Sequence, residues 1–248
     1  MNRCDAIKIL VLCLAVTSRI PLVHATVDTV RGAVEFKNKT FDELELSGAA
    51  DLKNVVAKKL TAHGSLHFDD LVIEEELSIF GSCSGKNLKA QRVLTHGGAT
   101  LNEAAAECIE GSGGLSCTNV MVTGDFVHKG GLTAKGLSVA GTLFVSGGVD
   151  IIAGVLDAVC LKGNEHTLVD TNVRFITIEA GIPSLVQRLL RFFRTLFGSD
   201  ISEQGADLYL SGATVVQEDV VFVGAPGVVH LSGSAVIKGR IVNGSVAS

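Results

Sequence analysis

Cys83 lies in the segment GSCSG, residues 81–85, which has the spacing of a nucleophile elbow with cysteine in place of serine. In that motif a strand runs into a sharp turn and then a helix, so that the nucleophile projects at the turn. The residues after Gly85 instead begin a copy of a repeat, LKAQRVLTHG at 88–97. The absence of a helical pattern favours a corner loop over a cysteine nucleophile. The segment GSCSGK also lacks the spacing and the Ser or Thr of a phosphate-binding loop.

Histidine and glutamate are the other residues whose chemistry has to be weighed. His63 and His96 are 33 residues apart, which is two turns of the repeat described below. Strands stack about 4.8 Å apart, so these side chains would be nearly 10 Å apart, too far for one metal ion. Together with His67 and His128 they have no recognised ligand spacing. The acidic run 74–76 is more typical of a solvated corner than of an acid/base pair. The sequence therefore predicts no catalytic residue, no metal site and no cofactor.

A ten-residue pattern defines the elements that would position these side chains. It occurs as VVAKKLTAHG (55–64), LKAQRVLTHG (88–97), LSCTNVMVTG (115–124) and LTAKGLSVAG (132–141). Each copy opens on a branched apolar residue, places a small residue two positions on and a second branched residue three positions later, and closes on Gly. The closing glycines are Gly48, Gly64, Gly81, Gly97, Gly124 and Gly141. Their gaps are 16 or 17 residues except for one of 27, which we interpret as a longer turn carrying GSGG.

Apolar residues two positions apart point to one side of an extended chain, so each unit contains two short strands separated by a corner. One unit cannot bury its apolar row alone, but stacked units bury the rows in a column and pair every strand with its neighbours. The sequence therefore predicts an all-β fold, a single-stranded β-solenoid of about 17-residue turns, in one domain spanning 26–248. One interior column is expected to contain Leu60, Leu77, Val93, Val120 and Leu137.

Three segments carry a resemblance to a known family. LTAKGLSVAG (132–141), TLFVSGGV (142–149) and AVIKGRIVNG (235–244) resemble the turns of bactofilins, which are polymer-forming bacterial cytoskeletal proteins. The resemblance implies a β-helix core that joins end to end. The chain departs from the family in a predicted export signal, whereas bactofilins work on the cytoplasmic side, and in one helical segment.

That segment is SLVQRLLRFFRTLFGSD, residues 184–200, and it predicts an amphipathic α-helix over 184–197 inserted in the solenoid (insertion 183–199). Ser184 is placed to cap its start and Gly198 to end it. The helix would cover the side or mouth of the solenoid, lie on an anionic membrane surface, or dock a partner. The candidate membrane or partner contacts are Arg188, Arg191, Phe192, Phe193, Arg194 and Phe197.

The first 25 residues have the pattern of a signal peptide. A basic start with Arg3 and Lys8 precedes the apolar run 9–16, and the small residues Val23 and Ala25 stand where a signal peptidase requires them. The apolar run is much shorter than the roughly 20 residues that span a bilayer. We therefore expect a secreted or periplasmic protein, located at the cell envelope or outside it.

The export signal bears on charge and on cysteine chemistry. Its removal takes away three basic and one acidic residue, so the net charge of −5 becomes −7, and nucleic acid is not an expected partner. Four cysteines remain, and an oxidising compartment would permit disulfides between them. They are Cys83, Cys108, Cys117 and Cys160. The pairing stays open, and Cys117 occupies a small inward position where a buried free thiol is an equal alternative.

These observations favour an exported structural or interaction protein that self-associates or binds a surface, rather than an enzyme. The alternative is a β-helix enzyme that acts on carbohydrate, which would need an acidic cluster beside Arg or Lys, or a hexapeptide-like acyltransferase. Gly124, Gly130 and Gly136 do fall six residues apart, but Gly141 breaks that spacing.

Overall fold

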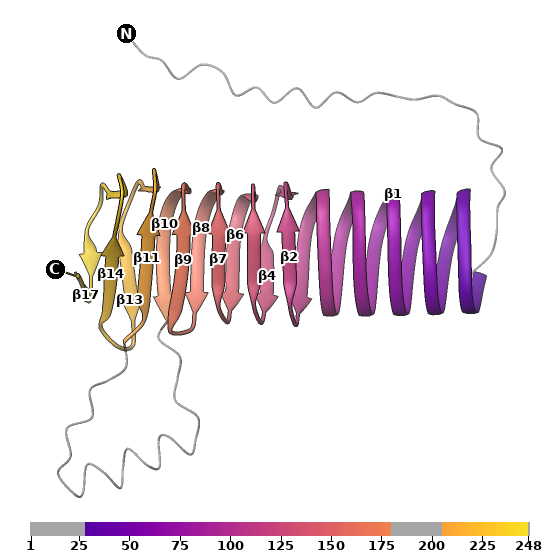
Figure 1. Cartoon of the computed structure of the whole chain (residues 1–248), viewed down its shortest axis with the longest axis horizontal. Helices are drawn as coiled ribbons and strands as arrows, with labels where there is room; N and C mark the ends of the chain where they lie inside the picture. The colour runs from indigo at the N-terminus through magenta and orange to yellow at the C-terminus, as the bar shows by residue number, and fades with distance from the viewer. Residues whose placement is uncertain (1–27, 180–204, 248) are drawn as a thin grey trace, which may run out of the picture.

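The chain coils through strands that all pair in parallel. The structure is a computed structural model, and it describes residues 28–179 and 205–247. Paired residues are 16 or 17 apart along most of the chain, as in Ala99 with Leu115 and Leu115 with Leu132. Every element in the described residues is a β-strand. The predicted all-β solenoid and its repeat length are therefore confirmed, and Figure 1 shows the coils stacked along one axis.

The strands form three faces that run the length of the coil (Figure 1). Their bounds are β1 (Asp28–Ser112), β2 (Leu115–Thr118), β3 (Met121–Val122), β4 (Phe126–Lys129), β5 (Leu132–Lys135), β6 (Ser138–Ser146), β7 (Val149–Ile152), β8 (Val155–Lys162), β9 (Glu165–Val169), β10 (Asn172–Glu179), β11 (Asp207–Ser211), β12 (Val215–Val216), β13 (Val220–Val223), β14 (Gly227–Leu231), β15 (Val236–Ile237), β16 (Ile241–Val242) and β17 (Gly244–Val246). Face 1 contains β2, β5, β7, β9, β11, β14 and β17. Face 2 begins with β3 and face 3 with β4, while β6, β8 and β10 each cross from face 2 to face 3.

Glycine builds the corner between face 3 and face 1, which we call the glycine corner. Its members are Gly32, Gly48, Gly64, Gly81, Gly97, Gly113, Gly130, Gly147 and Gly163, all with positive φ. A Cβ added at Gly97 would lie 2.0 Å from the carbonyl oxygen of Gly81, and the other stacked members show similar close approaches. Only glycine fits, because it accepts positive φ and leaves room for the backbone of the turn below.

A second corner, between face 1 and face 2, also requires positive φ, and we call it the asparagine corner. Its non-glycine members are Asn38, Asn54, Asp70, Asn87, Glu103, Asn119, Ala153 and Asp170. Asn and Asp tolerate the left-handed region because their short polar side chains form local hydrogen bonds. Here the side chains also bond between turns: Asn54 donates to Asn38 and Asn87 donates to Asp70, each at 2.8 Å.

The glycine corner corrects the predicted register. The column passes from Gly97 through Gly113 and Gly130 to Gly147 without interruption, so the 27-residue turn carrying GSGG does not exist. Gly124 and Gly141 lie instead at the third corner, where the Gly141 amide donates to the Gly124 carbonyl. The ten-residue pattern therefore occurs at two different places around the coil. The structure also has three faces per turn, where the pattern predicts two strands.

The third corner absorbs the difference between 16- and 17-residue turns. Val139 pairs with Leu156, but the next pair along face 3 is Thr142 with Ala158, so β6 has one extra residue between these pairs. Such a bulge adds a residue to one strand without changing the register on either side. The inward rows consequently stay aligned although turn length varies.

The core is filled by two inward residues per face in each turn. All five residues predicted for one interior column are buried, at no more than 1% exposure. They nevertheless belong to two columns: Leu60 lies four residues before Gly64, on face 3, while Val120 lies ten residues before Gly130, on face 2. Val93 shares the first column and Leu137 the second, so the single predicted column is wrong and the predicted burial is right.

The C-terminal turns continue the same three faces after an insertion. Ile176 of β10 pairs with Val220 of β13, although 44 residues separate them. The described coil stops at Glu179 and resumes at Gly205, at the glycine corner (Figure 1). The predicted helix 184–197 and its candidate contact residues lie outside the described residues, as does the predicted signal peptide 1–25.

Candidate interaction surfaces

Both ends of the described coil leave inward apolar positions uncovered. At the N-terminal end, Val34 and Phe36 of β1 are only partly buried, whereas Ala50 and Leu52, one turn further on, are 6% and 0% exposed. These pairs occupy the same positions of successive turns. The difference therefore reflects a missing neighbour and not a change of side-chain type.

The C-terminal end shows the same loss of cover more strongly. Leu231 and Val246 are 39% and 48% exposed, while their register partners Leu210 and Val229 are both at 0%. Within the described residues, β17 also has only one parallel neighbour, β14. A strand edge with free N–H and C=O groups beside exposed apolar side chains favours pairing with another strand.

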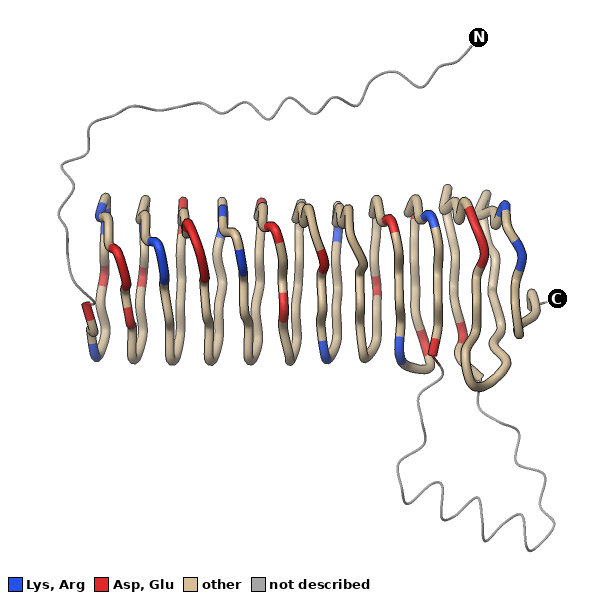
Figure 2. The backbone as a smooth tube through the Cα atoms, turned by 180° about the vertical axis from the view of Figure 1, so that it is seen from behind, with Lys and Arg blue, Asp and Glu red and all other residues tan. Residues whose placement is uncertain are grey.

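Ion pairs between turns occupy the third corner, which we call the charged corner (Figure 2). Lys58 lies 2.7 Å from Asp42, and Lys59 lies 3.4 Å from Glu75. Further along, Arg174 bridges Asp157 and Glu218, which come from the turns on either side of it. Exposed pairs of this kind contribute little to stability singly, but their alternating signs match the stacking of the turns.

An acidic cluster beside a cation is present at the charged corner, which bears on the carbohydrate-enzyme alternative. A shallow depression is lined by Lys59, Glu75, Glu76, Gln91, Arg92, Glu107 and Cys108. Beside it Arg92 contacts Glu110 at 2.7 Å and Glu76 at 3.9 Å. Hydrogen bonding to Glu110 raises the pKa of Arg92, which stays a cation. The arrangement is that of a ladder in which the guanidinium ties two neighbouring turns together.

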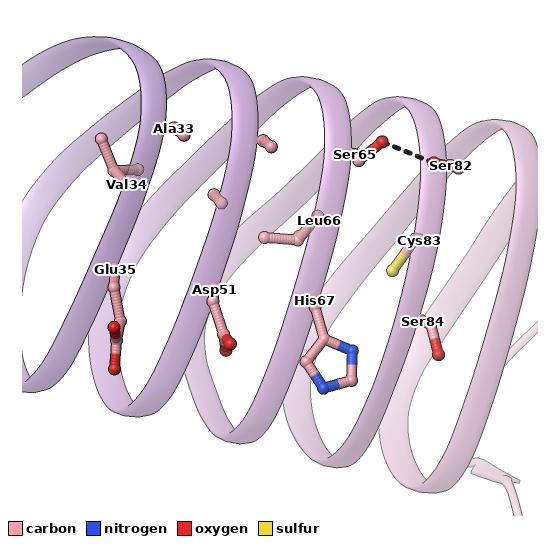
Figure 3. A pocket seen from close by; sticks show the side chains of 12 residues that line it. Ala33, Val34, Glu35, Asp51, Ser65, Leu66, His67, Ser82, Cys83 and Ser84 are labelled. Atoms are coloured by element: carbon pink, nitrogen blue, oxygen red, sulfur yellow. Dashed lines mark hydrogen bonds between the residues drawn. The ribbon is translucent and has the colours of Figure 1, made fainter.

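A groove runs along face 1 over the first four turns (Figure 3). One wall is formed by outward side chains in successive turns: Glu35, Asp51, His67 and Ser84. The opposite wall is formed by the small residues Ala33, Ala49, Ser65 and Ser82. Ser82 donates to Ser65 at 3.0 Å, so the two hydroxyls bond each other across the turns. The groove is shallow because these side chains are small.

The cysteines do not form a nucleophilic site. Cys83 points inward from face 1 and is 5% exposed, and burial raises the pKa of its thiol to about 12. A thiol with that pKa stays protonated at neutral pH and is a poor nucleophile. Burial also raises the pKa of Cys117 to about 12. The four cysteines proposed for disulfides, Cys83, Cys108, Cys117 and Cys160, are all free thiols in the structure.

The histidines lie in three separate settings. His63 and His96 are two turns apart, as predicted, and the ring of Phe80 is stacked between them at centroid distances of 4.9 and 5.2 Å. His128 is in the core, 1% exposed, where Nε2 donates to the Gly113 carbonyl at 3.0 Å and Nδ1 has no hydrogen-bond partner among the described residues. No group of three or more His, Cys, Asp or Glu side chains in the described residues is arranged to hold a metal ion.

His166 is the buried group that the sequence pattern did not single out. It occupies an inward position between Val149 and Leu208 and is 0% exposed, and neither ring nitrogen has a hydrogen-bond partner in the described part of the chain. Burial lowers its pKa to about 4, against a weaker opposing effect of the Gly163 backbone. The sequence gives no warning of this burial, because a histidine that directly follows Glu165 reads as an ordinary polar residue.

The asparagine corner and the two open ends were also missed by the sequence reasoning. Asn38, Asn54, Asp70 and Asn87 recur every 16 or 17 residues, and this spacing was a readable signal. The open ends have no comparable signal, because exposure depends on which turn is last. No helix in the described residues is long and apolar enough to cross a membrane.

Comparison with known proteins adds no relative to this description. No protein-family model, curated protein or solved structure matches the chain.

Proposed function

We propose that the protein is an exported structural protein of the cell envelope that self-associates through the ends of its β-solenoid. The observation that carries this proposal is the exposure of inward apolar positions in the terminal turns, above all Leu231 and Val246. Another coil stacked on such an end would cover these side chains and pair the free strand edge, as each turn does for the next. The resemblance to bactofilin turns and the predicted signal peptide support assembly and export respectively.

The test compares one valine at an end with one on a side face. Val246→Lys places a charge in the inward row of the last turn, and we expect it to shift the protein from oligomers to monomers. Val155→Lys is the matched control, because Val155 is 60% exposed on the side of the coil. Light scattering after size-exclusion chromatography, with electron microscopy, measures the particle mass and shape.

Three results would count against the proposal. The first is a wild-type chain that stays monomeric from micromolar to near-millimolar concentration. The second is Val155→Lys disrupting the oligomer while Val246→Lys leaves it intact. The third is signal-peptide cleavage and export both failing when the full-length gene is expressed in a bacterial host.

A further inference from the structure

The terminal turns carry opposite charge. The first described turn, residues 28–47, contains five acidic and three basic residues, which gives a net charge of −2. The last turn, residues 227–247, contains two basic residues and no acidic one, which gives +2 with histidine neutral. The basic residues are Lys238 and Arg240, and Arg240 is 84% exposed at its side chain. The two ends of the coil are thus electrostatically complementary to each other and not to themselves.

Both cations of the last turn are held at the charged corner by the turn below. Lys238 donates to the Gln217 side chain at 2.8 Å, and Arg240 contacts Asp219 at 3.2 Å. Their register is the one in which Arg174 contacts Asp157 on one side and Glu218 on the other. A cation in this position is therefore built to contact acidic groups from both neighbouring turns.

We propose that two copies of the chain join head to tail, with the acidic N-terminal end of one copy facing the basic C-terminal end of the next. This inference rests on the proposed self-association and specifies its polarity. Head-to-tail stacking brings −2 against +2, whereas a two-fold junction brings −2 against −2 at one end or +2 against +2 at the other. Facing charges of like sign disfavour association, and opposite signs speed it.

Strand direction supports the same polarity. Every ladder in the described residues is parallel, including the last one, between β14 and β17. A coil that adds in the same orientation continues the parallel pairing that the twist and register of the fold already fit. A two-fold junction would require antiparallel pairing at the interface alone. Such head-to-tail contacts repeat without closing and produce filaments.

The experiment reverses the charge of one end at a time. Lys238→Glu with Arg240→Glu changes the last turn from +2 to −2, and Glu35→Lys with Glu43→Lys changes the first turn from −2 to +2. None of the four residues occupies an inward position. We expect each double variant alone to assemble about tenfold more weakly than the wild type at low salt. We expect an equimolar mixture of the two double variants, or one chain with all four changes, to recover assembly.

Circular dichroism of each double variant checks that the coil is intact, and the recovery in the mixture excludes misfolding as the cause of the loss. Assembly that is unchanged in both double variants, with no recovery to observe, would overturn the head-to-tail polarity while leaving end-to-end association in place. Stronger association when one double variant is mixed with wild type than in either alone would indicate two-fold junctions. A wild-type chain that stays monomeric would instead defeat the proposed function itself.

Discussion

At the scale of single residues, two adjacent glycines have different structural roles. Gly97 has φ of 133° and its added Cβ would lie 2.0 Å from the Gly81 carbonyl oxygen, whereas a Cβ at Gly98 would meet nothing within 4 Å. We expect Gly97→Ala to lower the free energy of unfolding by about 1–3 kcal/mol, because the strained backbone and the close approach act together. Gly98→Ala is the neighbouring control and should change it by less than about 0.5 kcal/mol. Urea denaturation measures both, and equal effects would contradict the glycine corner.

The buried imidazole of His166 makes stability depend on pH. Its pKa is lowered to about 4, so below the ordinary value of 6.5 the unfolded chain binds a proton that the folded chain does not. The contribution of this group is therefore constant above pH 6.5 and is lost as pH falls from 6.5 towards 4. At pH 5 the loss is roughly 2 kcal/mol.

His166→Leu tests that dependence, since leucine fits a row that already contains Val149 and Leu208. We expect the variant to lose less stability than wild type between about pH 7 and about pH 5. His67→Gln, on the exposed wall of the face 1 groove, is the control and should leave the pH profile unchanged. An identical acid loss in His166→Leu and wild type would show that His166 is not buried in its neutral form.

At the scale of elements, the asparagine corner has one member poorly suited to it. Ala153 has φ of 57° but no polar side chain, whereas most of the column is Asn or Asp. A non-glycine residue in the left-handed region costs roughly 1–2 kcal/mol, and Asn lowers that cost. We expect Ala153→Asn to raise the free energy of unfolding by about 0.5–1 kcal/mol in thermal or chemical denaturation.

Ala105→Asn, at a position without positive φ, separates the corner from a general effect of asparagine. It should leave stability unchanged or lower it. A gain of the same size at position 105 would mean that the improvement at 153 has nothing to do with backbone conformation.

The corners also show which parts of the fold were readable from the sequence. The inward rows follow from alternation along each strand, and Leu60, Val93 and Leu137 are buried as predicted. The phase of the repeat was not readable, because glycine is accepted at two corners for different reasons. At the glycine corner it supplies positive φ, while Gly124, at the charged corner, has an added Cβ only 2.9 Å from the Glu107 carbonyl oxygen.

At the scale of the whole molecule, the described chain is a stack whose turns contact only their neighbours. Stability in such a stack is close to a sum of turn and interface contributions, so the terminal turns are the least supported. The ends were not predictable from local patterns, since Leu231 and Leu210 are the same residue type in the same row. Only the absence of a following turn in the described residues makes Leu231 an interaction surface.

The central claim, that turns stack in the register set by the glycine corner, is tested most directly by disulfide trapping between turns. With all native cysteines replaced by alanine, Thr100→Cys with Ser116→Cys should form an intramolecular disulfide, because these residues are register partners. Parallel neighbours lie about 4.8 Å apart, within the reach of a disulfide. Thr100→Cys with Val127→Cys is the pair that a 27-residue turn would bring together, and it should stay reduced. Peptide mapping under non-reducing conditions reads the result, and a disulfide in the second pair but not the first would contradict the fold described here.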